Sequence, residues 1–255
     1  MIAQSAGKSP AAVCGPVDLR GVPGCTALCD RSGQATVTRR HAERMEAQPW
    51  PSATNFDGWY ADMAGSPVKD EIMQRHLGLP SHLLSTSLLG WEGIAEVAGA
   101  LHLSPGDRLL DLACGRGGYG LEIAARSGAR LVGVDFSAEA VRQAREHARR
   151  WGQMADFRLG DLAATGVDAA SVDAVLCVDA IQFAQQPDAA YREIQRVLAP
   201  GGRAVLTCWE PTGHDDERLP DRLRRVGVGP GLAAAGFDTI QVQDRPGWRA
   251  RERAM

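Results

Sequence analysis

Between residues 105 and 210, short apolar runs alternate with segments whose apolar residues recur every three or four positions. The apolar runs predict strands at 108–113, 130–136, 156–160, 173–181 and 203–210. The other segments predict helices at 121–128, from Ser137 onward and at 188–198. Repeated units of this kind predict an α/β fold, a Rossmann-like doubly wound and mostly parallel sheet that binds ligands at the carboxyl ends of its strands.

The residues in front of this region predict helices as well. Apolar residues between 56 and 63 have helical spacing, and the segments 68–79 and 91–103 continue the pattern. The second of these segments is followed by Ser-Pro-Gly at 104–106, a turn signal. We therefore expect an N-terminal helical cap at 50–104, followed by a cofactor-binding domain at 105–210.

Both ends of the chain lack this periodicity. Residues 1–49 contain no aromatic residue and follow neither helical nor strand spacing, so we expect a disordered extension. Met45 precedes the first organised stretch, which makes it a candidate for the native start in place of Met1. Residues 211–255 form a C-terminal segment that is mostly polar at its start and predicts one strand at 239–243.

Charge and composition exclude several classes of function. The chain has 28 Lys and Arg against 31 Asp and Glu, and this net charge of −3 leaves no basic excess for nucleic acid or anionic lipid. No apolar run approaches the roughly 20 residues of a membrane helix, and the first residues lack a signal-peptide pattern. We expect a cytoplasmic protein with neither nucleic acid nor a membrane as partner, and the oligomeric state stays open.

The cysteines do not have the dense spacing of a disulfide scaffold, since they lie at 14, 25, 29, 114, 177 and 208. Cys25 and Cys29 form a C-x3-C pair, but Ser32 stands where an iron–sulfur radical enzyme needs a third cysteine. A zinc site formed by Cys14, Cys25, Cys29 and His41 is an alternative, although the spacing matches no familiar zinc knuckle. We expect incidental thiols and no metal.

Glycines follow the first predicted strand. Gly115, Gly117 and Gly120 match the pattern G-x-G-x-x-G between a strand and a helix. Glycines let the backbone pass close to a ligand, and the N-terminus of the next helix offers unpaired N–H groups. The pattern alone is weak, because glycines that only form a turn produce it as well.

Three aspartates accompany consecutive strands. Asp111 lies inside the first strand, Asp135 ends the second strand 20 residues after the first glycine, and Asp161 follows the third strand. The second aspartate is placed to accept hydrogen bonds from two ribose hydroxyls, the third from an adenine amino group, and Phe136 and Leu162 would cover the purine. A buried carboxylate at Asp111 is costly without a partner, so it favours a ligand with an ammonium or sulfonium group over a dinucleotide.

The motifs occur in a fixed order along the chain. They are 109-LLDLACGRGGYG-120, 132-VGVDFS-137, 160-GDL-162, 173-DAVLCVDAIQF-183 and 197-VLAPGGRAVL-206. Together they resemble the class I S-adenosylmethionine-dependent methyltransferases, in particular the small-molecule branch that includes quinone-biosynthesis and natural-product enzymes. The likeness covers residues 105–210 firmly and 55–104 loosely, and it implies S-adenosyl-L-methionine as the cofactor.

The resemblance also implies which residues hold this cofactor. Those at its methionine end are Asp111, Ala113, Gly115, Gly117 and, from the N-terminal helices, Tyr60. Those at its ribose and adenine are Asp135, Phe136, Asp161 and Leu162. Val178 and Gln182 would line the methyl-transfer side, and the alternative for Tyr60 is packing in the core beside Trp59.

The implied function is transfer of the cofactor's methyl group to a small-molecule acceptor by direct in-line displacement. Such a reaction mainly requires alignment, and the residue that acts in catalysis is left unknown. Candidates for a general base are His214, His76 and His82, whereas Asp179 or Gln182 would orient the acceptor. The alternatives are an NAD(P)-dependent oxidoreductase and a truncated relative that binds the cofactor without turnover.

One departure from the family pattern concerns the end of the sheet. The family usually ends with an antiparallel strand pair after the fifth strand, often with an insertion that covers the substrate. Here only 239–243 predicts a strand in that region. We therefore expect the sheet to lack its last antiparallel strand or to fill that place in another way. The acceptor, and whether oxygen, nitrogen or carbon is methylated, stay open.

Overall fold

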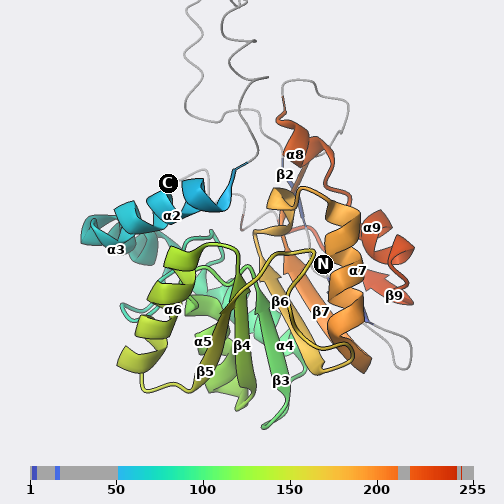
Figure 1. Cartoon of the computed structure of the whole chain (residues 1–255), viewed down its shortest axis with the longest axis horizontal. Helices are drawn as coiled ribbons and strands as arrows, with labels where there is room; N and C mark the ends of the chain where they lie inside the picture. The colour runs from blue at the N-terminus through green and yellow to red at the C-terminus, as the bar shows by residue number, and fades with distance from the viewer. Residues whose placement is uncertain (1, 5–14, 18–50, 212–218, 246–247, 249–255) are drawn as a thin grey trace, which may run out of the picture.

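A twisted sheet forms the centre of the molecule, with helices on both sides (Figure 1). The computed structural model describes residues 2–4, 15–17, 51–211, 219–245 and 248. In this part of the chain the sheet has seven strands, in the order β5 (Ala155–Leu159), β4 (Arg130–Asp135), β3 (Arg108–Leu112), β6 (Val172–Val178), β7 (Leu198–Thr207), β1 (Ile2–Gln4) and β9 (Thr239–Gln241). The first five strands of this order, β5, β4, β3, β6 and β7, pair in parallel, which confirms the Rossmann-like α/β fold.

The helices pack through the apolar stripes that the sequence predicts. They are α4 (Trp91–Leu101), α5 (Gly118–Ser127), α6 (Ala138–Arg150), α7 (Pro187–Val197) and α9 (Val228–Ala234). Helix α6 buries Val141 and Ala144 and turns Arg142 outward, while α7 buries Ile194. Strand β6 is buried except at Asp173, as expected of a strand covered on both faces. Helix α4 lies behind the sheet and α7 in front of it (Figure 1).

The N-terminus contributes a strand to the sheet. Strand β1 lies between β7 and β9 and is antiparallel to both, with Ala3 opposite Ala204 and Ile240. The short strand β2 (Gly15–Val17) pairs in parallel with β8 (Trp209–Pro211). The prediction of a disordered extension is therefore wrong for residues 2–4 and 15–17, and the rest of 1–49 lies outside the described residues. Three residues show too little periodicity to be recognised, because their pairing uses backbone groups rather than a pattern of side chains.

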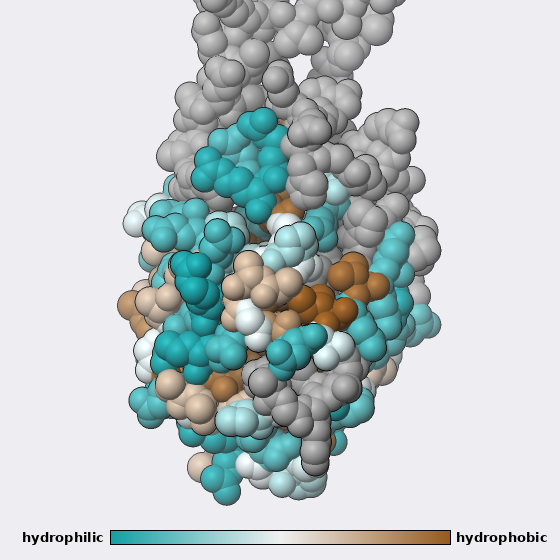
Figure 2. Space-filling view, turned by 90° about the vertical axis from the view of Figure 1, so that its right-hand side faces the viewer, coloured by the Kyte–Doolittle hydropathy of each residue, from teal (hydrophilic) through white to brown (hydrophobic). Residues whose placement is uncertain are grey.

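This pairing also answers the question about the last antiparallel strand. The C-terminal segment contributes α8 (Asp221–Arg224), α9 and β9, and β9 runs parallel to β7 because both are antiparallel to β1. The antiparallel place beside β7 is thus filled from the other end of the chain. Figure 2 looks onto this side of the molecule and shows hydrophobic residues gathered near its middle, among polar ones. Val242, which follows β9, is 53% exposed.

Helices α2 (Ala53–Ala64) and α3 (Pro67–Leu77) precede strand β3 in the sequence. In space they lie above one end of the sheet (Figure 1). Both confirm the prediction of helices in this segment. Helix α4, which the sequence groups with them, packs instead on α5 and on the strands β6 and β7. In the described ranges, no helix combines the length and apolar character needed to cross a membrane.

Candidate active site

A cavity of about 430 Å³ opens at the carboxyl ends of the strands. Ala113 follows β3, Asp135 ends β4, and Val178 ends β6, and all three line the cavity. The segment from Gly160 to Leu162, after β5, closes one side, and helix α2 covers the opening with Phe56, Trp59 and Tyr60. The cavity therefore lies where an open α/β sheet binds its ligands.

The loop between β3 and α5 takes the shape that its glycines allow. Gly115 and Gly117 have φ angles of 51° and 77°, which favour glycine, and Ala113 adopts 56° although it has a side chain. A Cβ at Gly115 would lie 2.8 Å from the Tyr60 hydroxyl oxygen, so the loop also needs glycine for close approach. Of the predicted loop residues, Ala113 borders the cavity, whereas Gly115 and Gly117 lie behind its lining.

Asp135 is the most buried carboxylate that faces the cavity. Its side chain is 4% exposed, and its two oxygens accept N–H bonds from Gly115 (2.8 Å to Oδ2) and Ser137 (2.9 Å to Oδ1). Each carboxylate oxygen has a second lone pair, which leaves acceptor capacity for ligand hydroxyls. Burial raises the pKa of Asp135 to about 6, although the backbone donors oppose this shift.

Asp111 occupies a different position from the one expected of it. It is 3% exposed and does not line the cavity, and its Oδ2 has no hydrogen-bond partner. A Cβ at Gly120 would lie 2.5 Å from this oxygen, so the carboxyl group points at the first turn of α5. Burial, and next the charge of Asp135, raise the pKa of Asp111 to about 8, which favours the neutral acid. The expected contact with the methionine end thus stays a prediction that this geometry does not support directly.

The residues predicted to hold the adenine all line the cavity; they are Phe136, Asp161 and Leu162. Asp161 is exposed, and its Oδ1 accepts the N–H of Ala163 at 2.9 Å. Asp135 and Asp161 therefore share one cavity, as the strand pattern predicts, whereas Asp111 stands apart from them.

The predicted acceptor side of the cavity combines aromatic rings with Val178 and Asp179. Phe56 meets Phe136 and Phe183 edge to face, with ring centroids 5.1 and 5.5 Å apart. Phe183, the last residue of the motif at 173–183, lines the cavity, and so do four residues that the motifs do not include, namely Asn55, Phe56, Thr86 and Ser87. The helical spacing of Phe56 was a signal for a buried helix face, and the Ser/Thr-rich segment after α3 offered none.

Asp179 lines the cavity, but its carboxylate is held by the protein. Oδ1 accepts the Thr207 hydroxyl at 2.7 Å, and Oδ2 accepts the N–H of Leu88 at 3.1 Å. Gln182 does not line the cavity, because its Nε2 donates to the backbone oxygen of Asp179 at 2.7 Å and turns the side chain into the protein. The expectation that Gln182 faces the methyl-transfer side is therefore not met. His214 lies outside the described residues.

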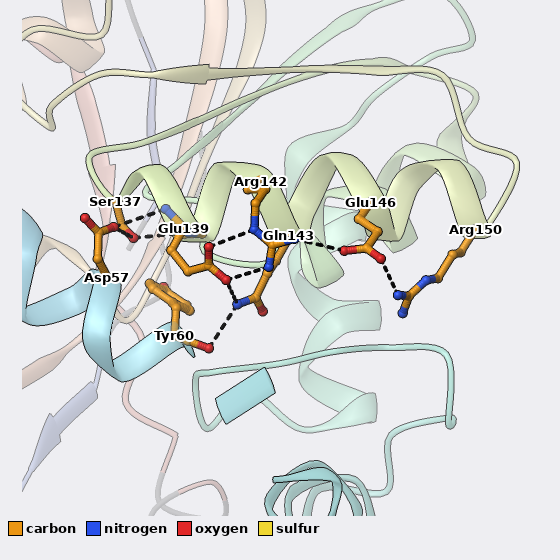
Figure 3. Close-up of polar contacts among 9 residues, drawn as sticks. Asp57, Tyr60, Ser137, Glu139, Arg142, Gln143, Glu146 and Arg150 are labelled. Carbon is orange, nitrogen blue, oxygen red and sulfur yellow. Dashed lines mark hydrogen bonds and ion pairs between the residues drawn. The ribbon is translucent and has the colours of Figure 1, made fainter. Parts of the chain in front are cut away.

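Helix α2 is fastened to α6 by polar contacts (Figure 3). Asp57 Oδ1 accepts the Ser137 hydroxyl at 2.6 Å and the N–H of Glu139 at 3.1 Å, so it caps the N-terminus of α6. Gln143 Nε2 donates to the backbone oxygen of Tyr60 at 2.9 Å. These contacts hold Tyr60 beside the glycine loop, where burial raises the pKa of its hydroxyl well above the usual range.

Helix α3 is joined to the glycine loop by a buried ion pair. Arg116 is 5% exposed, and its two terminal nitrogens donate to the two carboxylate oxygens of Asp70 at 2.6 and 2.9 Å. Among the described residues, no three His, Cys, Asp or Glu side chains gather in a way that could hold a metal ion. Cys14, Cys25, Cys29 and His41 lie outside these residues.

The part of the chain that forms this fold and cavity resembles a known class of protein. Residues 110–206 match the family model described as a methyltransferase domain. Together with the sheet, this match confirms the resemblance to class I S-adenosylmethionine-dependent methyltransferases for this part of the chain.

Individual relatives agree with this class. The chain is 35% identical over 136 residues to squalene methyltransferase 2 of Botryococcus braunii, and 34% identical over 145 residues to 24-methylenesterol C-methyltransferase 2 of Oryza sativa subsp. japonica. These alignments cover 52% and 56% of this chain but only 35% and 40% of the relatives. The chain thus spans well under half the length of the curated relatives that it matches.

Solved structures show the same fold. The [4+2]-cyclase SpnF superposes with a TM-score of 0.52 and 31% identity, covering 56% of this chain and 55% of the other. Phosphoethanolamine N-methyltransferase 2 of Haemonchus contortus, solved in complex with S-adenosyl-L-methionine, gives a TM-score of 0.56 at 21% identity, with coverages of 68% and 42%. At that identity the second likeness shows the fold alone.

Proposed function

We propose that this protein transfers the methyl group of S-adenosyl-L-methionine to a small-molecule acceptor by direct in-line displacement. The observation that carries the proposal is one cavity that is lined by Asp135 and Asp161 together with Val178 and aromatic rings. It joins a place for a ribose and a purine to a place for a second, mostly apolar molecule.

The residues present fit the cofactor. Asp135 is buried and faces the cavity with one accepted N–H on each oxygen, so it can take two ribose hydroxyls. Phe136 and Leu162 would cover the purine, Asp161 would accept from its amino group, and Ala113 and Tyr60 would border the methionine end. When bound, the cofactor supplies an electrophilic methyl group on a sulfonium.

The protein's own contribution is alignment and exclusion of water. Phe56, Trp59 and Tyr60 cover the cavity, and the contacts of α2 with α6 keep them there. Positioning of two reactants can lower a barrier by about 7 to 11 kcal/mol, which is the largest effect this site offers. The two oxygens of Asp179 accept from the N–H of Leu88 and the hydroxyl of Thr207, so we assign Asp179 the positioning of these two groups.

The relatives support a small-molecule acceptor, since their names specify squalene and sterols. They give no support to an NAD(P)-dependent oxidoreductase. One structural relative is named as a cyclase, so proteins with this fold have other activities as well. Methyl transfer must therefore be tested separately from cofactor binding. A cytoplasmic location and the absence of nucleic-acid and membrane partners belong to the same proposal, on the net charge of −3.

Calorimetry with S-adenosylhomocysteine tests the cofactor, with NAD as the comparison ligand. We expect micromolar binding of the first and none of the second, and loss of most binding in Asp135→Ala. Methyl transfer from labelled cofactor into a metabolite extract then tests turnover. Binding without transfer into any extract would leave a cofactor-binding relative and refute the enzyme, whereas equal binding by Asp135→Ala would refute the ribose assignment.

A further inference from the structure

One residue that lines the cavity also contacts an arginine. This residue is Phe183, which belongs to the 3-10 turn Ile181–Phe183 that follows β6. The guanidinium carbon of Arg222, on α8, lies 4.8 Å from the centroid of this ring. Arg222 therefore lies at the edge of the acceptor side, one aromatic ring away from the cavity.

Among the described residues, Arg222 differs from the neighbouring Arg224 and Arg225 in having no anionic partner. Arg224 and Arg225 both form ion pairs with Asp221, whereas none of the residues in the described part of the chain forms an ion pair with Arg222. The side chain is half-buried, and this desolvation alone lowers its pKa. A cation–π contact offsets only part of the cost of removing a guanidinium from water. An arginine held in this way favours the arrival of an anion.

We propose that Arg222 binds an anionic oxygen group, such as a carboxylate or a phosphate, at the end of the acceptor that lies beyond Phe183. This inference rests on the proposed function, because it concerns the acceptor of the same cavity. The apolar body of the acceptor lies among Phe56, Phe183 and Val178, and its charged end reaches the guanidinium. The planar fork of an arginine matches such groups with two parallel hydrogen bonds.

The charges around the cavity agree with this assignment. Asp135, Asp161 and Asp179 line it, so an anion is disfavoured over most of its surface. Arg222 provides the opposite charge at one edge, and it thereby selects the orientation of a molecule that has one apolar and one anionic end. The acceptor class is accordingly an apolar molecule with a terminal carboxylate or phosphate.

Three probes of one shape test the proposal: 2-naphthoate, 2-naphthyl phosphate and the neutral 2-naphthamide. Their binding is measured by calorimetry on the full chain saturated with S-adenosylhomocysteine. We expect at least one of the two anions to bind about tenfold more tightly than the amide, the effect of one charge-assisted hydrogen-bond pair. In Arg222→Met this ratio falls to about one, whereas Arg225→Met, the matched control at the C-cap of the same helix, keeps it.

The ratio separates recognition from a structural role. If Arg222 only supports the Phe183 ring, Arg222→Met weakens anions and amide alike and leaves their ratio unchanged, and this result would overturn the proposal. Equal affinities of all three probes for the parent protein would overturn it too. Binding of S-adenosylhomocysteine is measured first in each variant, so that failure of the cofactor site is recognised separately from failure of the anion site.

Discussion

The ion pair between Arg116 and Asp70 joins the glycine loop to helix α3, and Asp70→Asn tests how firmly the cap is held. Arg116 is 5% and Asp70 16% exposed, and both terminal nitrogens of the guanidinium donate to this one carboxylate. The third guanidinium nitrogen, Nε, has no partner. Asp70→Asn keeps the shape but leaves a buried cation without an anion.

The expected loss of unfolding free energy is large. Removal of one partner of a buried pair costs about 3 to 5 kcal/mol, and the slight exposure of Asp70 places this site at about 3 kcal/mol. For a domain of this size, each kcal/mol corresponds to about 2 to 4 °C in Tm, so we expect a decrease of about 6 to 12 °C. Glu146→Gln is the matched control, since it breaks surface pairs with Arg142 and Arg150 that contribute below about 1 kcal/mol.

Thermal and urea unfolding of Asp70→Asn, Glu146→Gln, Arg116→Met and the double variant at 70 and 116 provides the measurement. The double variant should be more stable than Asp70→Asn alone, because it removes the uncompensated charge. If Asp70→Asn loses no more stability than Glu146→Gln, or if Arg116→Met fails to relieve the loss, the reasoning about the buried pair is refuted.

Three further predictions concern the site and the sheet. Because burial raises the pKa of Asp135 to about 6, and only its carboxylate form can accept from both ribose hydroxyls, S-adenosylhomocysteine should bind about tenfold more weakly at pH 5 than at pH 7.5; calorimetry giving one affinity at both would contradict this. Gly118→Ala should cost about 1 to 3 kcal/mol in urea unfolding, since its Cβ would lie 2.3 Å from the backbone oxygen of Leu84, whereas Gly99→Ala, with open space, should not destabilise. Ala3→Pro should lower Tm, because proline removes a backbone donor from the strand between β7 and β9; an unchanged Tm would argue against that pairing.

The strand pattern located the cavity because strand ends are visible in sequence. A charged residue that ends an apolar run, as Asp135 does after Val134, lies at the carboxyl end of its strand. Parallel strands bring their carboxyl ends together on one side of the sheet. The N-cap of α6 was predictable for the same local reason, and the Ser137 hydroxyl does accept the N–H of Ala140 at 3.1 Å.

The features that escaped prediction depend on tertiary packing. Asp111 is one position inside its strand, and whether it faces the cavity or α5 depends on the space above Gly120. Gln182 is turned inward by a 3-10 turn of three residues, which has no recognisable period. Strand β1 pairs with residues about 200 and 240 positions away, and such distant partners cannot be predicted from the local sequence.

Ser137, at the start of α6, links the helical cap directly to the predicted ribose site. The N–H of Ser137 donates to Asp135, while its hydroxyl donates to Asp57 of α2. One residue thus fixes the carboxylate that would hold the ribose and the helix that covers the cavity. Loss of the Asp57 contact would remove one of the two polar contacts that fasten α2 to α6, and the bond from Gln143 to the backbone oxygen of Tyr60 would remain. Cofactor affinity and closure of the cap are therefore expected to change together when this link is altered.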